Sequence, residues 1–111
     1  MDRKKFGLIK KLERFKKQIA SKYDPEKIIF FGSRASGKTH IHSDVDIIIV
    51  SKNFEGKKSY KRSPDLYLEW HFNTDINLPV DFLCLTPEEF EKKKKQIGIV
   101  KTAVEEGIEI R

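Results

Sequence analysis

Short apolar runs that carry acidic residues are the feature that most constrains how this chain can fold. Apolar runs at residues 28–31, 47–50 and 80–85 have the length and the β-branched and aromatic content of buried strands, which are expected at 27–31, 44–51 and 80–85. Acidic residues open the second run and lie inside the third: Asp44, Asp46 and Asp81. Carboxylates are costly beside buried strands unless a cation meets them, so these acids predict a divalent-metal site.

A glycine and a serine supply the second half of the predicted site. Gly32 and Ser33 directly follow the first run, where glycine lets the backbone approach a ligand and a helix start favours phosphate. Residues two apart in a strand project to one face, so Asp44 and Asp46 point together. If the strand of Asp81 is their neighbour, about 4.8 Å away, Mg²⁺ offsets the repulsion among the carboxylates. The combination predicts a site for a nucleotide and Mg²⁺.

Two helices are expected to supply much of the core. Residues 3–22 have an apolar side chain every three or four residues, with lysine and arginine between, which predicts an amphipathic helix. Its inward side chains are expected to be Phe6, Ile9, Leu12, Phe15 and Ile19. Ser63 followed by Pro64 predicts another helix start, with the serine as cap. Its inward side chains are expected to be Leu66, Trp70 and Phe72.

The last part of the chain predicts two more helices and a short strand. Residues 86–89, Thr-Pro-Glu-Glu, form a capping box, residues 99–106 suit a helix, Gly107 suits its end and residues 108–110 suit a strand. The expected order is α-β-α-β-α-β-α-α with a terminal strand. It predicts an α+β fold (an α/β mixed sheet) with three or four strands and helices packed mainly on one face. The chain is expected to be a single domain, 1–111.

Composition bounds the partners and the compartment. The chain is 36% charged with a formal charge of +6, which favours polyanionic partners without choosing among nucleic acids, nucleotides and acidic proteins. The one cysteine, Cys84, predicts a small buried hydrophobe, which is consistent with a cytoplasmic protein. The N-terminal stretch lacks the apolar core of a signal peptide, and no apolar stretch approaches the length of a membrane span.

Residues 32–39 also match the P-loop pattern G-x-x-x-x-G-K-[ST], but the context argues against that reading. A P-loop lysine and threonine open a long helix that packs on the sheet. Here Lys38 and Thr39 are followed closely by Asp44 and a strand, which leaves no room for such a helix.

Several other residues carry weaker signals. His40 and His42 are expected on a loop near the nucleotide rather than in a zinc site, because no cysteine cluster accompanies them. Arg34 suits either a phosphate contact or a pair with an acid. Residues 92–95 are four lysines that would spread around a helix, which favours a solvated surface over a nucleic-acid patch. Tyr67, Trp70 and Phe72 are expected in the core or at a partner interface.

Together these motifs resemble the minimal nucleotidyltransferases of the DNA polymerase β-like superfamily, including its antitoxin-like members. The hallmark is Gly-Ser, a spacer, Asp-x-Asp and a later strand Asp, and this chain has ten residues between Ser33 and Asp44. Many relatives carry a basic residue at the position of Ser36. The phosphate or partner contact that such a residue would make is therefore not expected in this chain. The likeness extends over most of the chain, at residues 30–35, 43–46, 80–82, 86–90 and 103–107.

The resemblance implies a small nucleotidyltransferase fold and a role for each site residue. Asp44, Asp46 and Asp81 would be the catalytic residues. The first two would bind both of two Mg²⁺ ions, and Asp81 would bind the catalytic ion and help to activate the attacking hydroxyl. Gly32 and Ser33 would hold the β- and γ-phosphates of the nucleotide.

The implied reaction moves a nucleoside monophosphate, AMP from ATP as the expected case, to a hydroxyl acceptor. The resemblance implies that this acceptor is a tyrosine of a HEPN-domain toxin, which makes the chain an antitoxin. The alternative is a non-catalytic protein-binding module of the same fold that neutralises its partner by contact. Neither a nucleic-acid partner nor a membrane is expected.

Overall fold

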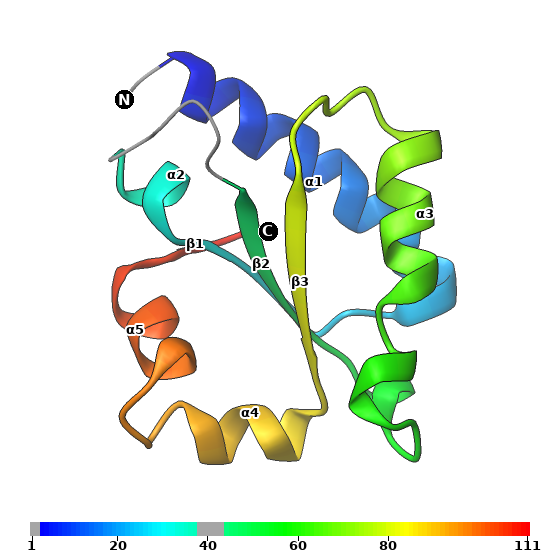
Figure 1. Ribbon diagram of the computed structural model, residues 1–111, viewed down its shortest axis with the longest axis vertical. Coiled ribbons are helices and arrows are strands. Elements are labelled where there is room, and N and C mark those ends of the chain that lie inside the picture. The colour runs from blue at the N-terminus through cyan, green and yellow to red at the C-terminus, as the bar shows by residue number, and fades with distance from the viewer. Residues whose placement is uncertain (1–2, 38–43) are drawn as a thin grey trace.

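One mixed sheet of four strands, in the order β3-β2-β1-β4, organises the structure (Figure 1). The computed structural model describes residues 3–37 and 44–111. The strands are β1 (Lys27–Phe31), β2 (Val45–Val50), β3 (Val80–Leu85) and β4 (Ile108–Glu109). β1 runs antiparallel to both β2 and β4, and β3 runs parallel to β2.

The strands lie where the apolar runs predicted them. β1 and β3 have the expected bounds, and β2 is one residue shorter at each end than the expected 44–51. The expected strand at 108–110 is β4, which ends at Glu109. The predicted α+β class with a mixed sheet is therefore confirmed.

Strand alternation divides the apolar side chains of the sheet between its two faces. The first-face cluster includes Ile28, Phe30, Val45, Ile47, Ile49, Phe82 and Cys84. The second-face cluster includes Ile29, Ile48, Val50 and Leu85, with Phe31 and Leu83 partly buried against it. Burial raises the pKa of the Cys84 thiol to about 12, so the cysteine is the inert buried hydrophobe that the sequence predicted.

The two longest helices, α1 (Arg3–Tyr23) and α3 (Pro64–Asn73), cover the first face. Phe15 of α1 meets Trp70 of α3 edge-on, with 5.3 Å between ring centroids. Trp70 also donates a hydrogen bond of 3.0 Å from Nε1 to the carbonyl oxygen of Leu78, just before β3. No helix in the described part of the chain combines the length and the apolar character that crossing a bilayer requires.

Two side chains expected in the core lie outward instead. Phe6 is 52% exposed because it lies two residues, about 200° around the helix, from Leu8, the first buried residue of α1. Phe72 is 70% exposed because it follows Trp70 by two residues, about 200° around the helix. Ser63 directly precedes α3 as predicted, but its side chain makes no capping hydrogen bond.

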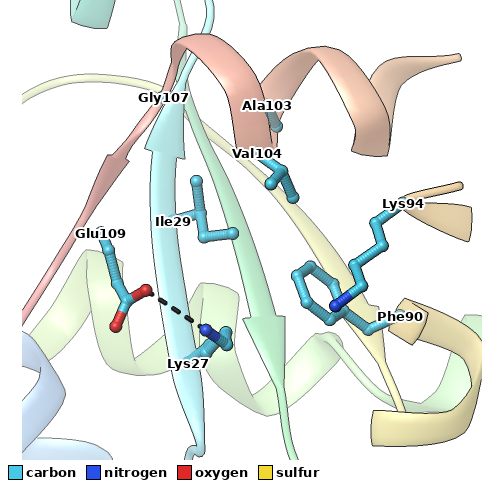
Figure 2. A pocket seen from close by; sticks show the side chains of 8 residues that line it. All are labelled: Lys27, Ile29, Phe90, Lys94, Ala103, Val104, Gly107 and Glu109. Atoms are coloured by element: carbon cyan, nitrogen blue, oxygen red, sulfur yellow. Dashed lines mark hydrogen bonds and ion pairs between the residues drawn. The ribbon is translucent and has the colours of Figure 1, made fainter.

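The shorter helices α4 (Pro87–Lys93) and α5 (Ile99–Glu106) pack on the second face, where Ile29, Phe90 and Ala103 line a pocket (Figure 2). The helices were expected mainly on one face, and the longest two do lie there, while α4 and α5 cover part of the other. The predicted capping box is confirmed, since Thr86 accepts from the Glu89 backbone and the Glu89 carboxylate accepts from the Thr86 backbone. Gly107 follows α5 as predicted.

α4 ends within the run of lysines at residues 92–95. Lys92 pairs with Glu88 at 3.3 Å, and Lys94 pairs with Glu91 at 2.6 Å. These pairs between neighbouring turns are typical of a solvated helix surface, as the sequence predicted.

Short elements connect the sheet to the helices. α2 (Ser33–Ser36) follows β1, and two single-turn 3₁₀ helices, η1 (Lys52–Phe54) and η2 (Ser59–Lys61), lie between β2 and α3. After η2 comes Arg62, which is only 7% exposed.

The buried guanidinium of Arg62 joins this connection to β3 and α4. It donates to the carbonyl oxygens of Lys57 at 2.9 Å and Cys84 at 3.1 Å. Its Nη1 lies 2.5 Å from the Glu89 carboxylate, and this hydrogen bond holds the pKa of Glu89 below its usual value. Glu89 thus serves both the capping box and the buried arginine.

Replacing Glu89 with alanine is expected to cost about 2 kcal/mol of unfolding free energy, because the cap and the partner of a buried cation are lost together. Glu88→Ala on the same helix is the matched control, since it removes only an exposed ion pair, worth about 0.5 kcal/mol or less. Urea unfolding of both variants measures the difference. Equal losses would contradict a structural role for the Arg62–Glu89 pair.

Candidate active site

Strand register brings two of the predicted acids together. Asp46 of β2 is the ladder partner of Asp81 of β3, and on its other side it is the partner of Phe31 in β1. Asp46 lies two residues before Ile48, so it projects to the second face. Asp44 is exposed and directly precedes β2. The acids therefore gather where β1 ends and β2 and β3 begin (Figure 1).

The charges of the acids act on one another. The pKa of Asp46 is raised above its usual value, first by burial and then by repulsion from Asp81 and Asp44. A bound cation would offset this repulsion among the three carboxylates.

Carboxylate oxygens are the hard ligands that Mg²⁺ takes, so the chemistry of this donor set fits a divalent ion. As they stand, however, no three histidine, cysteine, aspartate or glutamate side chains in the described part of the chain could hold a metal ion together. Mg²⁺ usually keeps several waters and binds through one or two carboxylates plus substrate phosphates. The set therefore fits an ion that arrives with a phosphate ligand.

Gly32 lets the Asp46 carboxylate lie against the backbone. Its φ of 84° is rarely adopted by other residues, and a Cβ placed there would come within 2.2 Å of Asp46 Oδ2. The sequence predicted that this glycine lets the backbone approach a ligand. In the structure its missing side chain also leaves room for one of the acids.

Ser33 opens α2 directly after Gly32. The first N–H groups of a helix lack acceptors within the helix, so they can meet phosphate. The short helix is anchored by the buried side chain of Ala35. Ser36 is turned toward its own helix, since its hydroxyl donates to the Ser33 carbonyl oxygen at 3.1 Å. Arg34 is half-buried on the same helix, and its predicted contacts stay a prediction.

Tyr67 is a site residue that sequence reasoning missed. Its Oη lies 3.3 Å from Asp81 Oδ1 and accepts a 3.1 Å hydrogen bond from the backbone N–H of Phe82. Burial raises the pKa of Tyr67 above its usual value, so the phenol keeps its proton at neutral pH. No sequence signal marks this residue, because its contact with Asp81 depends on how α3 packs beside β3.

The four predicted residues between α2 and Asp44 lie outside the described residues: Lys38, Thr39, His40 and His42. The P-loop, zinc and loop interpretations of these residues are therefore not tested by the structure. The neighbouring α2 is a four-residue helix that ends before Lys38.

Comparison with known families identifies the chain. A family model described as a nucleotidyltransferase domain matches residues 12–110. The chain belongs to the nucleotidyltransferase domain family. Nucleotidyltransferases use a nucleoside triphosphate and, in general, a divalent metal. This agrees with the acidic cluster and with the resemblance seen in the sequence.

One solved structure supports the same fold. A proposed nucleotidyltransferase from Sulfolobus solfataricus is 27% identical with a TM-score of 0.57, over 79% of this chain and 75% of that one. Another proposed nucleotidyltransferase is 26% identical over 80% of this chain and 89% of that one, with a TM-score of 0.47. No curated protein matches the chain.

Gly32→Ala is expected to lower the unfolding free energy by at least about 2 kcal/mol, from backbone strain and from displacement of Asp46. Gly37→Ala is the matched control, because Gly37 also has a positive φ, 85°, but an added Cβ would meet no atom within 4 Å. Its cost should be about 1 kcal/mol. Urea unfolding measures both. The difference should shrink when Asp46 is also changed to alanine, and a difference that persists would contradict the clash.

Asp46→Asn is expected to stabilise the metal-free nucleotidyltransferase at neutral pH, by roughly 0.5 kcal/mol for a partly solvated group. The raised pKa means that the ionised carboxylate disfavours the folded state. The gain should therefore be absent below the unfolded-state pKa of aspartate, appear as the pH rises through the folded-state pKa, and persist above it. Thermal unfolding in chelator at several pH values tests this, and a variant less stable at neutral pH would contradict it.

Proposed function

We propose that this chain, as a single nucleotidyltransferase domain, moves AMP from ATP to a hydroxyl group of a partner protein in a Mg²⁺-dependent reaction. The observation that carries the proposal is the register of β2 with β3, which sets Asp46 opposite Asp81 beside Gly32. Asp81 and Asp44 repel Asp46 at this end of the sheet, which suits an incoming metal–triphosphate complex. Alignment and charge neutralisation are what phosphoryl transfer mostly requires.

Each site residue has a distinct proposed role. Asp44 and Asp46 would hold two Mg²⁺ ions, and Asp81 would hold the one nearer the acceptor. Bound there, the ions would lower the pKa of the attacking hydroxyl and stabilise the charge that develops on the leaving oxygen. Gly32 and Ser33 would hold the β- and γ-phosphates through the backbone at the start of α2.

The proposed reaction forms one bond to the α-phosphorus of ATP and breaks another. The acceptor oxygen forms a bond to the α-phosphorus while the bond from that phosphorus to the bridging oxygen of pyrophosphate breaks. The proton of the acceptor hydroxyl leaves toward Asp81, the acid nearest the sheet edge. Products are the AMP ester of the acceptor and pyrophosphate.

A tyrosine of a HEPN-domain toxin is the proposed acceptor, so the chain would act as an antitoxin in the cytoplasm. The basis is the family resemblance together with an exposed apolar side of α3. Leu68 is 54% exposed and Phe72 is 70% exposed, on the helix whose Tyr67 contacts Asp81. A protein bound to this side of α3 would lie close to the site.

A contact-only antitoxin is the second candidate. It is favoured by one observation, that the apolar side chains of Leu68 and Phe72 on α3 are exposed, where a partner can cover them without any reaction. The same apolar side of α3 would then neutralise the partner by binding alone.

The test uses ATP labelled at the α-phosphate, Mg²⁺ and the protein that co-purifies with this chain. The partner should become labelled, and Asp46→Asn or Asp81→Asn should reduce the rate by a factor of at least about 100. Glu88→Gln is the matched control, since it removes an exposed carboxylate on α4. No labelling by the wild type, or undiminished labelling by Asp46→Asn, would overturn the catalytic proposal. Retained binding of the partner with full neutralisation by both variants would support contact alone.

A further inference from the structure

Tyr67 closes the outer edge of β3 beside the candidate site. β3 is an edge strand, so its outward backbone groups have no neighbouring strand. The Tyr67 ring packs on the Phe82 ring at 5.0 Å between centroids and 72° between planes. This packing brings Oη to the Phe82 N–H at 3.1 Å and to Asp81 Oδ1 at 3.3 Å. The ring is thus fixed from two directions.

The direction of the phenol proton follows from these contacts. A phenol has one proton, and the Phe82 N–H already occupies a lone pair of Oη. The proton of Tyr67 therefore points at Asp81 Oδ1. Asp81 is exposed, and within the described residues this is the hydrogen bond that its side chain makes. Without it, the carboxylate would rotate freely at the sheet edge.

A neutral donor suits a carboxylate that must still bind a cation. Lysine or arginine at the position of Tyr67 would also orient Asp81, but its positive charge would offset the charge that attracts the metal. The phenol orients one oxygen and leaves the carboxylate negative. Groups that act in this way through a ligand commonly change metal affinity tenfold or more.

We propose that Tyr67 is a positioning residue, which holds Asp81 Oδ1 so that the carboxylate stays beside Asp46 for metal binding. This inference rests on the proposed function, because it assigns Asp81 to the metal. It does not require that the acceptor is a tyrosine or that the partner is a toxin. A merely structural Tyr67, which only covers the strand edge, would leave metal affinity unchanged.

The test measures Mn²⁺ binding by electron paramagnetic resonance in the presence of α,β-methylene-ATP, which cannot react. Tyr67→Phe should weaken Mn²⁺ binding about tenfold, because the ring stays and only the hydroxyl is lost. Tyr60→Phe is the matched control, since Tyr60 is 67% exposed and its ring lies beside Lys61. In an Asp81→Asn background the effect of Tyr67→Phe should vanish. In the labelling reaction, kcat should fall while the KM for ATP stays within about twofold.

The outcomes separate this inference from the proposed function. If the wild type binds no Mn²⁺–nucleotide complex in an Asp46-dependent manner, the proposed function fails and the positioning role fails with it. If the wild type binds and transfers but Tyr67→Phe binds Mn²⁺ equally well, only the positioning role is overturned.

If Tyr67→Phe does not fold, NMR of ¹³C-labelled tyrosines replaces it. The Tyr67 signal should shift in Asp81→Asn and on addition of Mg²⁺ with the analogue, while the Tyr60 signal stays. An unmoved Tyr67 signal overturns the proposal.

Discussion

Parallel pairing of β2 with β3 is the constraint on which the rest of the structure depends. It sets Asp46 opposite Asp81, and the same register sets Ile47 to Val50 opposite Phe82 to Leu85. A shift of one residue would turn Asp46 toward the first face, against α1 and α3, and turn Ile47 away from it. Burial of the apolar residues therefore fixes the positions of the acids, although the acids themselves repel.

The repulsion is tolerated because it lies at the end of the sheet. Ile47, Ile48 and Ile49 are fully buried, whereas Asp44 and Asp81 are exposed and Asp46 is half-buried. Water screens charges at such a position far better than it could at the centre of the sheet. The apolar remainder of β2 and β3 supplies the stability that the repulsion among the acids removes.

The sequence predicted the elements whose signals are local. The apolar runs predicted β1 and β3, and the capping box predicted the start of α4, because each of these signals consists of residues that are neighbours in the chain. The pairing of Asp46 with Asp81 could be anticipated only on the assumption that their strands are neighbours. The family resemblance supplied the roles that local pattern could not.

Features that depend on packing between distant segments could not be predicted. The spacing of residues along α3 does not distinguish Tyr67 from its neighbours. Its hydroxyl lies near Asp81 only because α3 packs beside β3. For the same reason, the prediction that Phe72 faces the core is wrong, because the side of α3 that carries Phe72 lies outward. Likewise, the contact between Gly32 and Asp46 joins two strands, so it has no counterpart in the local sequence.

The outer edge of β3 is closed by side chains, and this limits how another chain can bind there. Tyr67 accepts from the Phe82 N–H, Arg62 donates to the Cys84 carbonyl oxygen, and Trp70 donates to the carbonyl oxygen of Leu78 just before the strand. Two backbone groups of β3 that could otherwise template an added strand, the Phe82 N–H and the Cys84 carbonyl oxygen, are therefore already bonded. A partner strand could extend the sheet on this side only by displacing Tyr67 and Arg62, so docking through surface shape and side chains is favoured.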